Sequence, residues 1–172
     1  GLARYMYDNT LIKDVTSGAA FEIRDMEGRS TTSSVTIGED RDSKDTHWGT
    51  RSGSYNSITF EYAGGPLGGD VYFNRYEATT QWFFPWRWDT SFMVEGRWGY
   101  VQQREGGKLP AYQKYHIGGI DTVRGYDYES ISPVDPATGD KIGGEKMMIY
   151  NFEFRFPLLQ EQGVLGVVFF DT

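Results

Sequence analysis

The segment from Val71 to Phe84 alternates in polarity at every second residue. Odd positions carry hydrogen-bonding side chains such as Arg75 and Glu77, whereas even positions are mostly apolar and lead up to Trp82. A period of two residues indicates a β-strand whose two faces meet different surroundings. The same alternation returns in two later segments, so the sequence predicts a chain built mainly from strands.

These segments predict an all-β fold of about seven antiparallel strands. The composition suits such a fold, because 22 glycines can supply turns and 28 aromatic residues (12 Tyr, 11 Phe and 5 Trp) favour strands. We expect one or two helical turns within 19–24. The expected strands lie at about 1–8, 31–42, 54–62, 71–84, 90–103, 145–157 and 163–172, with a long loop at about 104–144.

Two architectures fit strands of this kind, a soluble β-sandwich and a transmembrane β-barrel. In a sandwich the apolar face is the core, whereas in a barrel it meets lipid and the charged face lines a wet lumen. The barrel is favoured because the strands reach about 12 residues, where soluble strands average about 5–6. Aromatic residues also gather at strand ends around 82–88, and long connections alternate with short ones. We therefore predict an incomplete antiparallel transmembrane β-barrel.

Several functions are disfavoured by charge and composition. The net charge of −7 argues against nucleic acid as a partner. Cysteine is absent and the only histidines are His47 and His116, which argues against a zinc site. The acidic residues between 39 and 45 lack the glycine and the bidentate glutamate of a calcium loop. No nucleophile elbow is present, so we expect no enzyme activity, no metal and no cofactor.

The long loop at 104–144 contains an arginine in an unusual setting. Arg124 follows Gly118 and Gly119 and immediately precedes Gly125. Glycines allow positive φ and a close approach of the backbone to another surface. Structureless loops longer than about 15 residues are uncommon unless they are functional or disordered. We therefore interpret Arg124 as a residue with a specific partner, although most loop arginines are simply solvated.

Candidate partners for Arg124 come from the two strands that follow the loop. Glu153 lies on the charged face of the expected strand at 145–157, and Asp171 lies on the last strand. A guanidinium can bond two carboxylates in a fixed geometry. These residues predict that the loop folds inward and is held in the lumen by an ionic cluster.

Three stretches carry a resemblance to a known family. They read Gly-Gly-Ile-Asp-Thr-Val-Arg-Gly-Tyr at 118–126, Ile-Gly-Gly-Glu-Lys at 142–146 and Asn-Phe-Glu-Phe-Arg-Phe-Pro-Leu at 151–158. Together they resemble the barrel domain of the bacterial surface antigen (outer-membrane insertase) superfamily, which includes the BamA and TamA branches and the Toc and Sam translocases of organelles. The resemblance covers the whole chain and is greater to the BamA branch. It implies a functional loop motif of Val123, Arg124, Gly125 and Tyr126, with Glu153 and Asp171 as its lumenal partners.

The resemblance also implies a location and a function. It implies that residues 1–172 are part of the C-terminal barrel domain of a longer protein in the outer membrane of a Gram-negative bacterium. That protein would assemble and insert outer-membrane β-barrel proteins, with lipid, nascent barrel proteins and the Bam lipoproteins as partners. The alternatives are a TamA-like translocation and assembly barrel, a passive outer-membrane pore plugged by the loop, and a soluble binding module.

Overall fold

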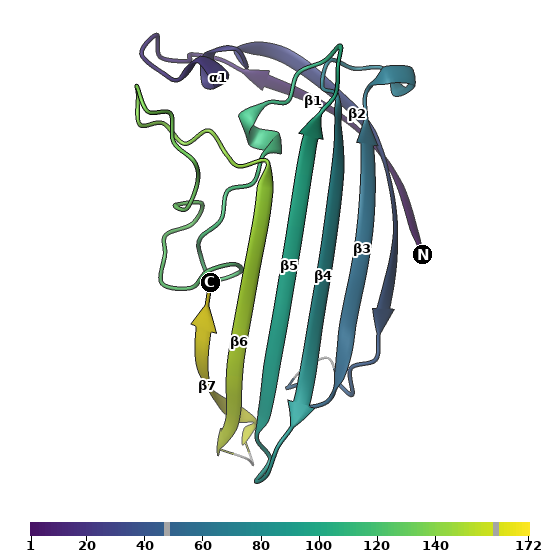
Figure 1. The fold of residues 1–172 in the computed structure, drawn as a ribbon, viewed down its shortest axis with the longest axis vertical. Helices are drawn as coiled ribbons and strands as arrows, with labels where there is room; N and C mark the ends of the chain where they lie inside the picture. Colours follow the sequence, from purple (N-terminus) through teal and green to yellow (C-terminus); the bar gives the residue numbers. More distant parts are fainter. Residues whose placement is uncertain (47–48, 160–161) are drawn as a thin grey trace.

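The computed structural model describes residues 1–46, 49–159 and 162–172, which fold into one seven-stranded antiparallel sheet in chain order (Figure 1). The all-β fold expected from the sequence is therefore confirmed. In the described residues, no helix has the length and apolar character needed to cross a membrane. The strands are β1 (Leu2–Ile12), β2 (Gly28–Asp42), β3 (Gly53–Ala63), β4 (Phe73–Pro85), β5 (Ser91–Gln103), β6 (Lys146–Leu159) and β7 (Val164–Asp171).

The first hairpin is longer than the sequence predicts. β1 continues to Ile12, beyond the expected end at residue 8, and β2 already begins at Gly28. The extra residues, among them Leu11 and Ile12, do not alternate in polarity, but their backbones pair in register, with Thr10 opposite Ser30 and Ile12 opposite Gly28. Backbone pairing thus extends the strands past the point where the alternation of side chains fades. The expected helical segment between these strands is one short helix, α1 (Phe21–Arg24).

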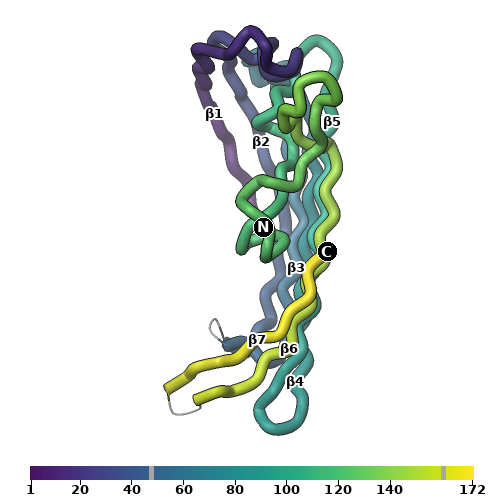
Figure 2. Tube along the Cα trace, turned by 90° about the vertical axis from the view of Figure 1, so that its left-hand side faces the viewer, coloured from purple at the N-terminus to yellow at the C-terminus, as the bar shows by residue number. Residues whose placement is uncertain are grey.

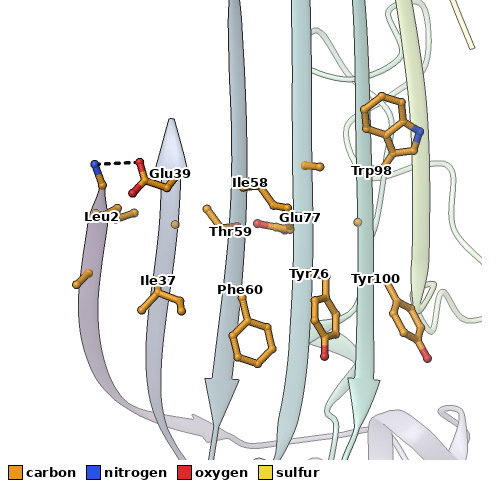
Figure 3. Close-up of a pocket in the computed structure, with 15 residues that line it drawn as sticks. Leu2, Ile37, Glu39, Ile58, Thr59, Phe60, Tyr76, Glu77, Trp98 and Tyr100 are labelled. Atoms are coloured by element: carbon orange, nitrogen blue, oxygen red, sulfur yellow. Dashed lines mark ion pairs between the residues drawn. The ribbon is translucent and has the colours of Figure 1, made fainter. Parts of the chain in front are cut away.

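The register separates the side chains of the sheet into an inward and an outward set. On the outward face, Phe60, Tyr76 and Tyr100 stand opposite one another across β3, β4 and β5, as Figure 3 shows. Their rings are 5.0 Å apart between Phe60 and Tyr76 and 6.3 Å apart between Tyr76 and Tyr100. A shallow groove between this row and the next is lined by apolar side chains including Ile58 and Trp98. This face has the chemistry of a surface in contact with lipid.

The two ends of the sheet differ in their connections. The connections 13–27, 64–72 and 104–145 all lie at one end, and those that follow β2, β4 and β6 lie at the other (Figure 1). Figure 2 shows that the long loop descends along one face of the sheet rather than projecting away from it. The loop contains a short 3-10 helix, η2 (Ala111–Gln113), and isolated bridges join Tyr115 to Gly144 and Ile117 to Ile131. A second 3-10 helix, η1 (Gly65–Leu67), follows β3.

A small apolar core lies where the loop leaves the sheet. Ala63, Val71, Phe73 and Val101 form it, and each of these side chains is fully buried. Val71 was expected to open β4 but precedes it, joined by an isolated bridge to Lys108. Leu109 and Tyr115 of the loop pack against the same cluster. The long loop is therefore part of the folded structure from its first residues onward.

Candidate functional site

The register of the last four strands brings polar side chains into one inward row. Gln81 on β4 stands opposite Glu95 on β5, and Glu95 stands opposite Asn151 on β6. Asn151 in turn stands opposite Asp171 on β7. Directly opposed residues in an antiparallel pair have Cβ atoms about 4.5–5.5 Å apart, within reach of hydrogen bonds between side chains. Strand pairing alone therefore builds a polar strip across the lumenal wall.

Arg124 of the long loop meets this strip through Asp171. Its backbone nitrogen donates to Oδ2 of Asp171 at 2.9 Å, and Nε donates to the same oxygen at 2.7 Å. Nη2 of Arg124 donates to Oδ1 of Asp171 at 2.6 Å. The Asp171 side chain is only 2 % exposed. A bidentate pair in such a place combines charge with a fixed geometry, so it holds the loop in one position.

Glu153 supplies the second carboxylate of the cluster. Nη1 of Arg124 donates to Oε1 of Glu153 at 2.6 Å, and the Glu153 side chain is 9 % exposed. The other oxygen of Glu153 accepts hydrogen bonds from Arg155, whose Nε lies 2.7 Å and Nη2 2.6 Å away. The two carboxylates therefore face two guanidinium groups, which keeps the buried charges balanced.

The segment 118–126, called the tip here, is shaped to deliver Arg124. The backbone nitrogen of Gly118 donates to Oγ1 of Thr122 at 2.8 Å, and the carbonyl oxygen of Thr122 accepts from Nδ2 of Asn151 at 2.8 Å. Gly118 has φ of +116°, and a Cβ there would lie 2.5 Å from the carbonyl oxygen of Asp127. Only glycine fits that position without displacing the chain.

Aromatic rings support the arginines of the lumenal face. The guanidinium of Arg124 lies 3.8 Å from the ring centroid of Phe169, and that of Arg155 lies 5.1 Å from that of Phe83. Phe83 and Phe169 point inward because they share the face of Glu153 in the register. Cation–π contacts of this kind add stabilisation when the cation is partly removed from water.

The electrostatics of the cluster indicate a structural contact. The hydrogen bond to Asp171 raises the pKa of Arg124 above its usual range, although burial acts in the opposite direction. Arg124 is therefore a permanent cation and does not act as an acid or a base. In the described part of the chain, no group of three or more histidine, cysteine or acidic residues could hold a metal ion. The ionic cluster can hold the long loop against the strands.

The structure brings together three of the residues singled out in the sequence, Arg124, Glu153 and Asp171. The other residues of the motif differ in their surroundings. Val123 is buried, Gly125 has φ of +91°, and Tyr126 is exposed and lies outside the ionic cluster. Of the two histidines, His116 lies in the long loop, with Nε2 3.2 Å from the carbonyl oxygen of Ala111, and His47 lies outside the described residues.

Sequence reasoning missed three other members of the cluster. Asn151 bonds both Asp171 and the tip, Arg155 bonds Glu153, and Phe169 lies under Arg124. Asn151 and Arg155 share the parity of Glu153 on β6, so the alternation contained the signal for them. Phe169 shares the parity of Asp171, so the alternation contained a signal for it as well, but aromatic residues of these strands were expected to face lipid.

Comparison with known proteins identifies the family of the chain. The Omp85 superfamily domain matches residues 3–172. The outer membrane protein assembly factor BamA of Nitratidesulfovibrio vulgaris is 32% identical over 97% of this chain, which spans 21% of that protein. The sorting and assembly machinery component 50 homolog of Xenopus tropicalis is 32% identical over 74% of the chain and 26% of its own length.

A solved structure shares the fold. The crystal structure of BamA from Haemophilus ducreyi lacking POTRA domains 1-3 superposes with a TM-score of 0.74. It is 21% identical in sequence, and the match covers 83% of this chain and 30% of that chain. Since the family domain covers nearly the whole sequence, this chain is a BamA-like member of the Omp85 superfamily.

Proposed function

We propose that the chain forms part of the barrel wall of an outer-membrane insertase, with its long loop bracing the lumen. The chain spans 21% of the length of its BamA relative, so the activity is proposed for a whole protein of that kind. The location in the outer membrane of a Gram-negative bacterium is that of the BamA relatives. The observation that carries the proposal is the Arg124 cluster, which joins the tip of a 104–145 connection to β6 and β7.

The proposed work of such a barrel is mechanical. An unpaired strand edge offers backbone donors and acceptors to an incoming strand, which can add to the sheet. Folding of the substrate then supplies the free energy, and no covalent step is required. In this scheme the wall described here stays rigid, because a loop packed inside the lumen resists its collapse.

The proposed partners follow from the relatives and from the outward face. The name of the BamA relative points to the assembly of outer membrane proteins. For this chain we propose nascent outer-membrane β-barrel proteins as substrates and the Bam lipoproteins as further partners of the whole protein. Rows of aromatic side chains on the outward face, such as Phe92 against Phe154 at 4.9 Å, suit the lipid of the membrane.

An assembly assay on the full-length parent protein tests the proposal. The protein is reconstituted into liposomes, and folding of a urea-denatured outer-membrane barrel is followed with time. Arg124→Ala is expected to slow assembly, because it leaves Glu153 and Asp171 without their shared cation. Arg104→Ala is the matched control, since Arg104 belongs to the same loop but stacks on Tyr62 at 4.0 Å.

Two outcomes would contradict the proposal. Assembly at the unmodified rate by Arg124→Ala, with the loop loosened, would remove the bracing role. A reconstituted wild-type protein that conducts ions steadily but folds no substrate would indicate the passive pore instead.

A further inference from the structure

A second ionic contact reaches the long loop from another part of the sheet. Arg75 on β4 stands opposite Glu61 on β3, and Nη1 of Arg75 lies 3.2 Å from Oε2 of Glu61. Nη2 of Arg75 donates to the backbone oxygen and to Oε1 of Gln113 in the loop, each at 2.7 Å. One guanidinium therefore joins two strands of the wall to the loop.

Tyr115, two residues further along the loop, is also fastened. Its hydroxyl donates to Oε1 of Glu77 on β4 at 3.2 Å. A Cβ at Gly99 on β5 would lie 2.5 Å from Cζ of Tyr115, so the ring rests directly on the strand backbone. Tyr115 and Gly144 exchange two backbone hydrogen bonds of 2.8 Å. This pairing closes the loop where its descending and returning segments meet, and residues 109–117 with Gly144 are called the neck here.

Burial makes the contact with Arg75 consequential. The Glu61 side chain is 7 % exposed, and its Oε1 has no hydrogen-bond partner among the described residues. A buried carboxylate that loses its cation pays a large desolvation penalty. The guanidinium of Arg75 also lies 4.8 Å from the ring centroid of Phe73, a member of the apolar core. Removing Arg75 should therefore disturb the neck far more than removing an exposed arginine would.

We propose that Arg75, paired with Glu61, is a positioning residue that anchors the neck of the loop independently of Arg124. The neck is held by β4 and β5, with Arg75 paired to β3, and Tyr112 also bonds Ser30 of β2 at 2.9 Å. The tip is held by β6 and β7. The loop then acts as a strut between two parts of the wall. This inference rests on the proposed function in one respect, namely that such a strut would help the loop to brace the lumen.

Hydrogen–deuterium exchange on the full-length protein in lipid nanodiscs tests the second anchor. In Arg75→Ala, exchange of the neck should accelerate by about tenfold or more, as expected when a charged hydrogen-bonded contact is lost. The tip should change much less. In Arg75→Lys the positive charge facing Glu61 remains, but the two hydrogen bonds from Nη2 to Gln113 are lost. The acceleration of exchange should therefore be intermediate. Exchange reports loop order directly, so this test is separate from the assembly assay.

Gln81→Ala is the matched control, because Gln81 lies on the same strand and face but donates to Glu95 at 2.6 Å. Heat-modifiable migration in gels checks that each variant retains its barrel. If Arg75→Ala does not fold, Gln113→Ala should give a smaller acceleration confined to the neck. The proposal is overturned if the neck keeps its wild-type exchange in the Arg75 variants, or if Gln81→Ala accelerates it equally.

Discussion

The tip and the neck of the long loop are both held by arginines, but the arginine lies on the loop at the tip and on a strand at the neck. At the tip, Arg124 belongs to the loop and its partners Glu153 and Asp171 belong to the strands. At the neck, Arg75 belongs to a strand and its loop partner, Gln113, is neutral. The tip therefore depends on a balance of buried charges, whereas the neck combines one ion pair within the wall with packing against an apolar core. Loss of the arginine should be more severe at the tip.

The largest effect is expected for Arg124→Ala. Breaking a buried ion pair by removing one partner costs roughly 3–5 kcal/mol, because the remaining charge is left uncompensated. The free energy of opening the tip, measured from its hydrogen exchange, should fall by this amount. The neck should stay protected. Simultaneous loss of protection at the neck would mean that the two anchors are one cooperative unit.

The two carboxylates of the tip should contribute unequally. Asp171 accepts hydrogen bonds from three nitrogens of Arg124 and one of Asn151, whereas Glu153 accepts one from Arg124 and shares its charge with Arg155. Asp171→Asn is expected to weaken the attachment of the tip to the strands more than Glu153→Gln does. Each charged hydrogen bond that is lost should cost roughly 1.5–3 kcal/mol. Limited proteolysis of the tip ranks the two variants. The reverse order would contradict this reading of the cluster.

A backbone substitution distinguishes shape from charge at the tip. Gly118→Ala forces a side chain to φ of +116° and into the carbonyl oxygen of Asp127. A strained backbone position of this kind costs roughly 1–3 kcal/mol. Gly125→Ala is the control, because its φ is +91° but no atom lies within 4 Å of the added Cβ. Gly118→Ala should accelerate tip exchange more than Gly125→Ala, and equal effects would show that strain alone matters.

The smallest effect concerns pH and should separate neck from tip. Burial, followed by the charge of Glu77, raises the pKa of the Tyr115 phenol above its usual value of 10.0. The stabilisation from a protonated Tyr115 is complete below about pH 10, the value for an open loop, and is lost as the pH rises further. Arg124 stays charged throughout, because its hydrogen bond to Asp171 raises its pKa.

A nitroxide at Lys114 should therefore gain mobility above about pH 10, while one at Asp121 in the tip should not. The difference between the two anchors would be contradicted if the tip label gained mobility before the neck label, or if the mobility of the neck label did not change with pH.

The parity of the strands could be predicted from the sequence, and with it the inward direction of Glu153 and Asp171. The local rule of period two is enough for that. The neck could not be predicted, because the contact between Arg75 and Gln113 depends on the path of a loop whose residues carry no periodicity. The inward phenylalanines were missed for another reason. Alternation places Phe83 and Phe169 on the inward face, but residue type alone does not indicate that their rings support Arg155 and Arg124.

The extent of the first hairpin was also beyond the sequence pattern. Residues 9–12 and 28–30 extend the hairpin through backbone pairing, which is indifferent to side-chain type. Alternation reports where the two faces of a strand differ, and it is lost at residues 9–12, where two polar residues are followed by two apolar ones. The full length of the hairpin is seen only in the structure.

The exchange rate of the Arg124 backbone amide tests the central claim most directly. This N–H donates to Oδ2 of Asp171, and the bond exists only while the tip lies against β7. In the full-length wild-type protein, the amide should be strongly protected, and Asp171→Asn should remove most of that protection. A wild-type amide that exchanges at the rate of a free chain would show that Arg124 does not hold the loop in the lumen.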